Sequence, residues 1–497
     1  MKKLSSNLLF VLCFVFASSA QDPAGNCIEI SLAQFNTDGL LRYANCGNDV
    51  AFNTGSAITL EVWIRVVNSG DNQKVLGKTN GNFNSGYVMG IDQGRIYPEI
   101  WTPGLNELLH GFIPPIRRWV HLATTFENGD SIKGYVNGKF VGGAVATSAD
   151  IVSNNDPFII GIAPWDLTNF QTFGEIDEVR VWNVARTHEE IRQNMHRQLA
   201  GTETGLVAYY NFNESAGTTL TDHGPNALNC NMINVADNDW IGSRAVVGNT
   251  TVEGQLGIEA MWNGKGIGTT QFVATDNGLS TSSSALDSLD YLVYGHNGGT
   301  GNSTSDLPSN AVANFERMGR IWYLNEVGNI TTNLTFDLTD AAAGGTTLQT
   351  NQPASYYTLL FRSGATGTFT AIAMGDSKTN NSITFNDVTL QNGYYSIGVG
   401  DAEMTISTGG IPNPEMTGLT FQIYPNPGTD QIWVDASKAF SGWVTASIIN
   451  PLGQKVNEVR FNSQNITEVS LDGLAPGAFI LVVTDGTNTK SKMLVKE

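Results

Sequence analysis

Charged residues are scarce in this sequence, and basic residues are scarcer than acidic ones. Asp, Glu, Lys and Arg make up 15% of the 497 residues, and 27 basic against 46 acidic residues give a formal net charge of −19. Such a chain repels nucleic acid and anionic membrane surfaces, so we expect neither as a partner. The sparse charge beside 54 glycines argues against long helices and favours short strands joined by glycine-containing turns.

Long hydrophobic runs are missing beyond the N-terminus. Lys2 and Lys3 precede an apolar stretch at 8–16, and small residues follow at 17–20. This order is typical of a secretory signal peptide, and the apolar stretch is too short to span a bilayer. We therefore predict a signal peptide over residues 1–20 and a mature chain without a transmembrane segment.

Cysteine is rare as well. Of the four cysteines, Cys13 lies in the predicted signal peptide, which leaves Cys27, Cys46 and Cys230. An exported chain meets an oxidising environment, so one disulfide is expected, with one thiol left over. The sequence does not decide which two of the three form it.

Motifs of catalysis are absent. The sequence has no Gly-x-Ser-x-Gly elbow, no His-Glu-x-x-His helix and no phosphate-binding loop. His121 alternates with apolar neighbours on a predicted strand, which favours a structural histidine. Glu175 and Asp177 would share a strand face, but a surface acidic pair is the favoured interpretation because a glycosidase needs two converging carboxyls and Glu178 would point to the opposite face. We predict a protein that is not an enzyme.

The segment from about 28 to 235 has the pattern of an antiparallel β-protein. Residues 58–66 alternate apolar and polar, as a strand with one buried face does. Asn137-Gly138 is a strong hairpin signal. Thr187 and Glu190 form a capping box that predicts the start of a helix.

Several motifs in this segment occur in the order known from one family. They are Trp119-x-His121-x-Ala123, the Tyr-Val-Asn-Gly at 135–138, the stretch from Phe173 to Thr187, and the Leu-Val-Ala-Tyr-Tyr-Asn-Phe at 206–212. Residues 21–235 thus resemble the laminin-G-like, concanavalin-like jelly rolls. The chain departs from that family at 35–39, where Phe-Asn-Thr-Asp-Gly replaces the usual Phe-Asp-Gly turn.

The resemblance implies that the domain binds Ca²⁺, as family members often do. Asp177 is the first candidate ligand and Asp38, in the departing turn, is the second. The alternative for Asp177 is that it caps a turn or pairs with Arg180 or Arg186.

Glycan binding requires exposed aromatic side chains. Trp63, Trp119 and Trp182 lie in predicted strands and are assigned to the core. Trp101 and Trp165 lie among turn residues. We expect these two, together with Tyr97, to line a rim that binds a glycan or an extracellular protein, with packing within loops as the alternative.

Residues 240–402 contain a second series of strand patterns, typical of a β-sandwich. With a Tyr-Gly-His-Asn turn at 294–297 and an Arg-x-x-Arg-x-Trp strand at 317–322, they resemble a module of Bacteroidota surface proteins for which the family implies no activity. Residues 403–416 include Gly-Gly-Ile-Pro-Asn-Pro and are expected to form a linker.

The last segment, 417–497, has four features that belong together. It opens on Tyr-Pro-Asn-Pro, carries glycine turns and a Leu-x-x-Gly before an apolar strand, and closes on a basic strand. The segment resembles the type A C-terminal sorting domain of the type IX secretion system of Bacteroidota, an Ig-like β-sandwich. The residues that carry the resemblance are Tyr424, Pro425, Asn426, Pro427, Gly453, Leu474, Gly477, Lys492 and Lys496.

Taken together, the sequence predicts an all-β protein with an N-terminal jelly roll, a central β-sandwich and a C-terminal sorting domain. The resemblances imply handling by the type IX secretion machinery and a place outside the cell or on its surface. We expect a binding or adhesion protein that recognises glycan or extracellular protein. The alternatives are a structural component of the surface or matrix, or a secreted hydrolase.

Overall fold

The computed structural model shows an all-β protein. It describes residues 25–30, 40–67, 72–107, 110–112, 117–145, 148–262, 277–283, 286, 289–328, 330–406, 421–424, 430–436, 440, 442–450, 455–463, 467–484 and 489–496. The chain divides into two compact units, the first ending at Ser407 and the second beginning at Thr408. The predicted signal peptide, residues 1–20, and the predicted linker residues 407–416 lie outside the described residues.

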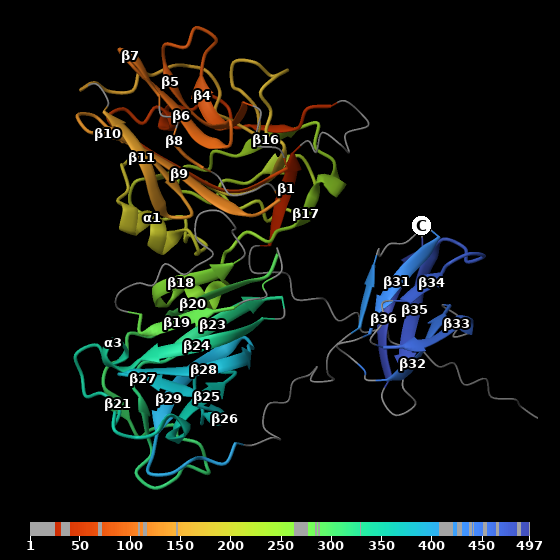
Figure 1. Ribbon diagram of the computed structural model, residues 1–497. Helices are drawn as coiled ribbons and strands as arrows, with labels where there is room; N and C mark the ends of the chain where they lie inside the picture. The colour runs from red at the N-terminus through yellow and green to blue at the C-terminus, as the bar shows by residue number, and fades with distance from the viewer. Residues whose placement is uncertain are drawn as a thin grey trace, which may run out of the picture. The chain divides into compact units, whose positions relative to one another are not determined.

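The N-terminal part of the first unit is built from two antiparallel sheets, as the resemblance to a jelly roll predicts (Figure 1). The first sheet has the order β11 (Lys139–Val145), β10 (Ser131–Val136), β9 (Val120–Glu127), β3 (Ala57–Val66), β13 (Gly174–Trp182), β1 (Asn26–Ile30) and β17 (Trp240–Gly242), with β14 (Leu206–Tyr210) paired to β13. The second sheet has the order β15 (Thr219–Leu220), β16 (Cys230–Ile233), β2 (Tyr43–Asn45), β12 (Ile159–Ile160), β4 (Gln73–Thr79), β5 (Gly86–Asp92), β6 (Arg95–Thr102) and β7 (Gly104–Glu107), with β8 (His110–Phe112) paired to β6.

The core of the jelly roll lies between these two sheets. Alternate residues of β3, such as Leu60 and Val62, face alternate residues of β5 and β6, such as Met89 and Ile100, in one buried apolar cluster. This is the arrangement that period-two patterns produce when two sheets pack face to face. The short helices of this part are η1 (Val50–Phe52), α1 (His188–Asn194) and η2 (Asp237–Asp239).

Two local predictions are confirmed. Asn137 and Gly138 connect β10 to β11 with φ angles of 50° and 67°, the left-handed conformation that a two-residue hairpin turn requires. Thr187 caps α1, and Glu190 returns the hydrogen bond to the backbone N–H of Thr187. Sequence alone identifies such features because both are contained within four residues.

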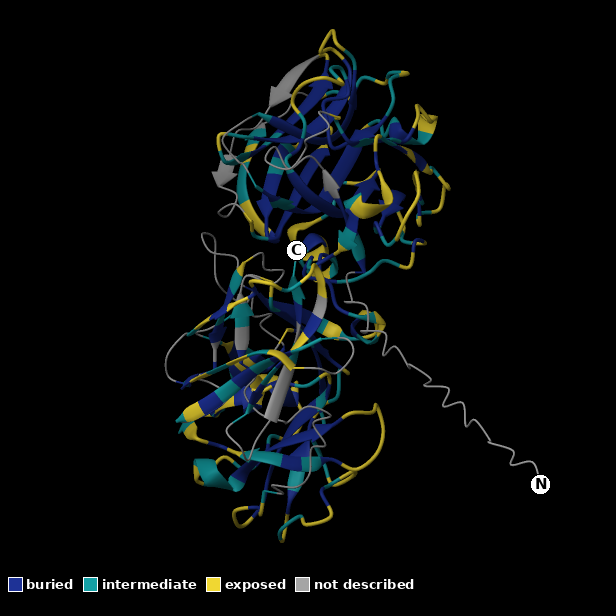
Figure 2. Ribbon diagram, turned by 90° about the vertical axis from the view of Figure 1, so that its right-hand side faces the viewer, coloured by how far each residue is buried: buried dark blue, intermediate teal, exposed yellow. Residues whose placement is uncertain are grey.

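The prediction of a strand with one solvated face was wrong for β3. Its polar residues Thr59 and Glu61 are fully buried, as is His121 beside them on β9. Figure 2 shows these central strands as buried and places most exposed residues in loops. The second face is covered because α1 and the chain that follows it fold back over the sheet.

The jelly roll also extends further than predicted. Residues Trp240–Gly242 form β17, which pairs with β1 at the edge of the first sheet. The boundary between the first two domains therefore lies after residue 242 rather than before residue 240.

The central domain is a β-sandwich, as predicted, and begins with α2 (Thr250–Glu253). One sheet has the order β18 (Leu256–Trp262), β20 (Tyr291–His296), β23 (Trp322–Val327), β29 (Gly393–Val399), β22 (Glu316–Met318) and β21 (Asn302–Ser303), with β25 (Tyr357–Arg362) paired to β29 and β26 (Thr370–Met374) paired to β25. The other has the order β19 (Leu279–Ser282), β24 (Thr331–Asp337), β28 (Ser382–Thr389) and β27 (Ser377–Thr379). The remaining helices are α3 (Leu338–Ala342) and η3 (Ala354–Tyr356).

The second unit is a small β-sandwich with its own apolar core. Its sheets have the orders β30 (Gln422–Tyr424), β31 (Gln431–Asp435), β34 (Thr467–Ser470) and β33 (Lys455–Asn462), β32 (Trp443–Ile449), β35 (Gly477–Thr484), β36 (Thr489–Lys496). Of the predicted sorting residues, Tyr424 ends β30, Gly477 begins β35, Leu474 precedes that strand, and Lys492 and Lys496 lie on β36. Pro425, Asn426, Pro427 and Gly453 lie outside the described residues.

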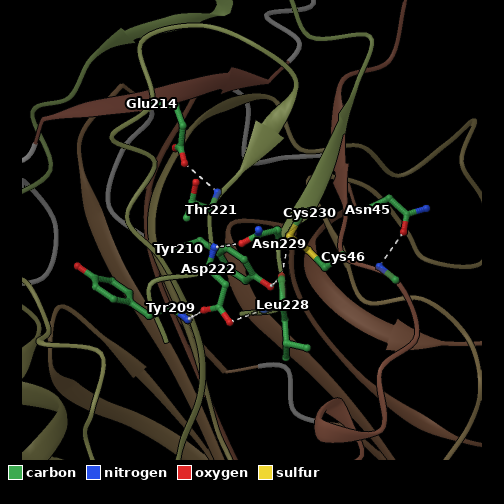
Figure 3. The surroundings of a disulfide bond; sticks show 11 residues. Asn45, Cys46, Tyr209, Tyr210, Glu214, Thr221, Asp222, Leu228, Asn229 and Cys230 are labelled. Atoms are coloured by element: carbon green, nitrogen blue, oxygen red, sulfur yellow. Dashed lines mark hydrogen bonds between the residues drawn. A yellow bond between two sulfur atoms is a disulfide. The ribbon is translucent and has the colours of Figure 1, made fainter. Parts of the chain in front are cut away.

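The disulfide joins Cys46, which follows β2, to Cys230, the first residue of β16 (Figure 3). Cys27 is the free thiol and is buried, and burial raises its pKa. Next to the disulfide the carboxylate of Asp222 accepts backbone hydrogen bonds from Tyr209 (2.9 Å) and Leu228 (2.7 Å). The bridge and this carboxylate together tie the closing segment of the jelly roll to the second sheet.

Candidate functional site: an aromatic face on the jelly roll

The outer face of the second sheet, which points away from the core, carries a group of aromatic side chains. In β6, Ile96 and Ile100 belong to the core. Successive side chains of a strand point to opposite faces, so Tyr97, Glu99 and Trp101 share the outer face. The sequence prediction that grouped Tyr97 with Trp101 placed both on one surface, although Trp101 was expected in a turn and lies in the strand.

A lysine crosses this face beneath the rings. Lys74 of β4 and Tyr97 of β6 both pair with Gly90 of β5, so the three positions form one row across the sheet. A Cβ atom at Gly90 would stand 2.5 Å from the Gln73 carbonyl oxygen and 3.0 Å from Cδ of Lys74. The glycine therefore leaves the room through which the lysine side chain passes.

The Lys74 ammonium lies 4.4 Å from the centroid of the Tyr97 ring and 5.6 Å from that of Trp165. It forms an ion pair with Glu99, and the lysine is only 2% exposed. Cation–π contacts and a buried ion pair thus hold both rings over one charged group.

Trp165 arrives from a loop far away in sequence, residues 161–173. The Gly161 N–H donates to the Val75 carbonyl (2.7 Å), and the Lys74 N–H donates to the Phe170 carbonyl (2.8 Å). These backbone bonds fix the loop along β4. They explain why Trp165 and Phe170 stand above the strand that carries Lys74.

Two phenylalanines complete the group. The ring of Phe83, in the β4–β5 turn, lies 5.0 Å from that of Trp165 at 78° and 6.2 Å from that of Trp101. The ring of Phe170 lies 6.1 Å from that of Trp165. Phe83 is 46% exposed and Phe170 is 39% exposed. We call the set of Phe83, Tyr97, Trp101, Trp165 and Phe170 the aromatic face.

Both phenylalanines have left-handed backbones, with φ of 52° at Phe83 and 58° at Phe170. Such a conformation costs a bulky residue on the order of 1–3 kcal/mol, whereas glycine or asparagine adopts it readily.

Sequence reasoning named Tyr97, Trp101 and Trp165 and missed Phe83 and Phe170. Phe83 lies in Asn-Gly-Asn-Phe-Asn at 80–84, where a large ring among turn residues is the same signal that singled out Trp165. The expectation for Trp101 needs correction. It is 1% exposed and lies beneath Phe83, so it supports the face and does not offer its own ring to a ligand.

The surroundings of Asp177 do not fit a calcium ion. The residue is fully buried in β13, where its carboxylate accepts hydrogen bonds from the Ser243 hydroxyl (2.6 Å) and the Glu178 N–H (2.7 Å). Burial, and then the nearby Glu178, raise its pKa well above the usual range. A Ca²⁺ ion needs ionised or carbonyl oxygen ligands. The Asp177 carboxylate instead accepts hydrogen bonds from two donors, and its raised pKa favours the protonated, uncharged form. The second candidate, Asp38, lies outside the described residues, and calcium binding stays a prediction.

The interpretation of Glu175 and Asp177 as a surface acidic pair was wrong. Both are buried, and Glu175 forms an ion pair with Arg65. A register shift between Asp177 and Arg180, with Glu178 at φ 54°, also breaks the alternation on which the prediction rested.

The neighbouring carboxylates belong to a buried network beneath α1. The Glu178 carboxylate accepts from Arg180 (2.6 Å) and from the Tyr209 hydroxyl (2.8 Å). Glu61 lies 3.3 Å from Nε2 of His121, and its pKa is lowered because His121 and Arg180 outweigh burial. These groups are paired and closed to solvent, so they hold the chain after β13 onto the sheet.

Comparison with known families identifies the class of each part. Residues 39–192 match the Concanavalin A-like lectin/glucanases superfamily. Residues 263–394 match a domain of unknown function, and residues 422–497 match the secretion system C-terminal sorting domain. The N-terminal part is thus a laminin-G-like, concanavalin-like jelly roll. The C-terminal sorting domain is of the kind that type IX secretion substrates of Bacteroidota carry, and it indicates that the protein is secreted or attached to the cell surface. Within the described residues, no helix is long and apolar enough to cross a membrane.

Solved structures similar to this chain include a putative carbohydrate binding protein from Bacteroides ovatus, with 24% identity and a TM-score of 0.34. The match covers 42% of this chain and 58% of that one, so the chain spans less than two thirds of its length. A pentraxin from Limulus polyphemus has 14% identity, coverage of 35% and 83%, and a TM-score of 0.28. The sialidase module CBM40 of Ruminococcus gnavus bound to sialyllactose has 14% identity, coverage of 34% and 97%, and a TM-score of 0.27. No curated protein matches the chain.

Proposed function

We propose that this protein is a non-catalytic carbohydrate-binding protein of the cell exterior and that its jelly roll holds glycan on the aromatic face. The observation that carries the proposal is the exposure of Phe83 and Phe170 around Trp165, above the buried pair of Lys74 and Glu99. A sugar ring offers an apolar C–H face to such rings and hydroxyl groups to the polar residues around them.

Energetics support a ligand at this place. Fully burying a phenylalanine side chain is worth about 1.5–3 kcal/mol, so a partner that covers one of these half-exposed rings gains roughly half of that. Neighbouring exposed apolar side chains also mark binding surfaces more often than scattered ones do. Leu167, in the same loop as Trp165, is a further exposed apolar side chain.

The carboxylates of the jelly roll support a binding role over a hydrolytic one. Hydrolysis of a glycosidic bond uses two carboxyl groups that both reach the substrate. Glu61, Asp177 and Glu178 are buried and engaged by arginine, histidine or hydroxyl partners, and Glu99 is paired with Lys74. A secreted hydrolase is therefore the weaker alternative.

An extracellular protein is the second candidate ligand, since exposed aromatic anchors also dominate protein interfaces. A purely structural surface or matrix role predicts no dependence on the aromatic face. Both are outcomes of the same experiment.

The experiment uses the secreted protein and a glycan array, with the variants Phe83→Asn and Phe170→Asn. Asparagine tolerates the left-handed backbone, so each variant removes a ring without adding strain. The matched control is Phe140→Asn, because Phe140 is an exposed phenylalanine on β11 of the other sheet. We expect each of the first two variants to weaken glycan binding by about two- to twelvefold and the control to keep it.

Equal binding by all variants with unchanged melting temperatures would refute the aromatic face as the site. Absence of glycan binding by the unaltered protein, with capture of an extracellular matrix protein that depends on Phe83, would favour the protein ligand. Repeating the glycan-binding measurement with EDTA tests the predicted binding of Ca²⁺ by the jelly roll. Loss on chelation and recovery with Ca²⁺ supports it, and unchanged binding removes it.

A further inference from the structure

We infer that the aromatic face takes a neutral oligosaccharide of at least two sugar units and discriminates against acidic glycans. The inference rests on the proposed function and specifies its ligand. It follows from two properties of the site, the balance of charge beneath the rings and the separation of the exposed rings between two segments.

The cation beneath the rings is already neutralised. Lys74 is buried and forms its ion pair with Glu99, whose side chain is also nearly closed to solvent. A carboxylate or sulfate that left water for this surface would need a cation to replace its hydration. Lys74 could serve only by giving up Glu99, which would leave that carboxylate buried and unpaired.

The loop above the pair adds negative charge. Asp166 follows Trp165, and its carboxylate accepts hydrogen bonds from the side chains of Thr168 (2.6 Å) and Asn169 (2.9 Å). These hydrogen bonds lower its pKa, so the group is ionised at neutral pH. An anionic sugar beside Trp165 would meet this charge, within a chain whose net charge is −19.

The polar residues that directly flank the exposed rings in sequence are uncharged. Asn82 and Asn84 flank Phe83 and are exposed, and Thr168 and Asn169 precede Phe170. Amides and hydroxyls donate and accept hydrogen bonds, which suits sugar hydroxyl groups. The chemistry around the rings is thus that of a neutral ligand.

The rings indicate a chain rather than a single sugar. Phe83 belongs to the β4–β5 turn and Phe170 to the loop before β13, and each packs against Trp165 from its own segment. One sugar ring stacks on one aromatic ring. A ligand therefore contacts both exposed phenylalanine rings only if it contains at least two linked sugar units. A stacking contact is worth about 0.5–1.5 kcal/mol, which is about two- to twelvefold in affinity for each additional ring covered.

The test is an array of neutral and acidic glycans of one to six units, followed by calorimetry with lactose against sialyllactose and with glucose, cellobiose and cellotetraose. We expect hits among neutral chains, affinity that rises with length, and little dependence on salt. Phe83→Asn and Phe170→Asn should each flatten the rise with length. Asp166→Asn should reduce the discrimination against the acidic member of each pair.

A second variant changes the charge balance itself. Glu99→Gln leaves Lys74 unpaired beneath the rings and should raise affinity for acidic glycans severalfold. If Glu99→Gln does not fold, Asp166→Asn tests the same effect of charge at the surface. Acidic glycans that bind best, with strong salt dependence and loss in Phe83→Asn, would overturn this inference and leave the proposed function standing. Equal affinity for glucose and for cellotetraose would overturn the inference that the ligand has at least two sugar units. No glycan binding at all would instead refute the proposed function.

Discussion

The indole rings of Trp63 and Trp262 meet edge to face, with centroids 6.0 Å apart and planes at 75°. Trp63 belongs to β3 of the jelly roll and Trp262 to β18 of the central sandwich. Trp63 also donates from Nε1 to the Met195 carbonyl (2.7 Å), and Arg192 of α1 forms an ion pair with Glu259 of β18 (2.5 Å). The two domains therefore share one buried apolar cluster rather than being joined by a flexible linker.

Replacing Trp262 by Ala should loosen this joint. The change removes a large buried ring from the shared cluster, and such truncations cost about 3–5 kcal/mol. We expect calorimetry to show a lower first transition and proteolysis to cut between residues 242 and 256. Trp443→Ala is the control, because that tryptophan is 60% exposed in the second unit. A melting profile identical to that of the control would contradict the shared core.

The disulfide should be a main source of stability for the jelly roll. It links residues 184 apart in sequence, and bridges that close long loops typically contribute about 2–4 kcal/mol. The double variant Cys46→Ser and Cys230→Ser should melt several degrees lower, and a reducing agent should produce the same shift in the unaltered protein only. Cys27→Ser serves as the control for loss of a thiol without loss of a bridge. If reduction leaves the melting temperature unchanged, the bridge is not stabilising.

His196 should make the first unit less stable in acid. Its ring is buried against Trp63 and Trp262, Nδ1 lies 2.7 Å from the Val246 carbonyl oxygen, and burial lowers its pKa to about 3. Below the unfolded pKa of about 6.5 the unfolded state takes up a proton that the native ring does not accept. Stability is therefore lost as pH falls from about 6.5 to about 3, by up to about 1.4 kcal/mol per pH unit.

The measurement is urea unfolding between pH 7 and pH 4. His196→Gln keeps an N–H donor for the Val246 carbonyl and does not titrate, so its stability should depend less on pH. Equal slopes for the two proteins across this window would show that His196 does not contribute.

Gly90→Ala should weaken ligand binding without touching the aromatic face. The new methyl group would stand 2.5 Å from the Gln73 carbonyl oxygen and 3.0 Å from Cδ of Lys74, so the β4 backbone must shift and the lysine beneath Tyr97 shifts with it. We expect a severalfold loss of affinity with the exposed rings still present, measured by calorimetry on the glycan found in the array. Gly81→Ala, at a turn position with open space around it, is the matched control.

Removing the sorting domain should stop export and not folding. The second unit has its own core, and the first unit ends before it. A chain that ends at residue 416 should accumulate in the periplasm as a folded protein that resists protease. Its normal appearance in the medium or on the cell surface would contradict the role of residues 417–497.

The sequence by itself determined the local elements and the kinds of domain. The alternation at 58–66, the Asn137-Gly138 turn and the Thr187 capping box each lie within a few residues, so neighbouring side chains decide them. The ordered motifs of the jelly roll and of the sorting domain were likewise sufficient to predict an exported all-β protein, which the families and the fold confirm.

Only the tertiary structure decided which of these residues meet. It paired Cys46 with Cys230 and left Cys27 free, placed Trp101 beneath Phe83, and covered the polar face of β3 that the alternation had assigned to water. Each of these outcomes depends on segments tens to hundreds of residues apart. Burial is a property of what packs over a side chain, and a periodic pattern along one strand contains no information on that.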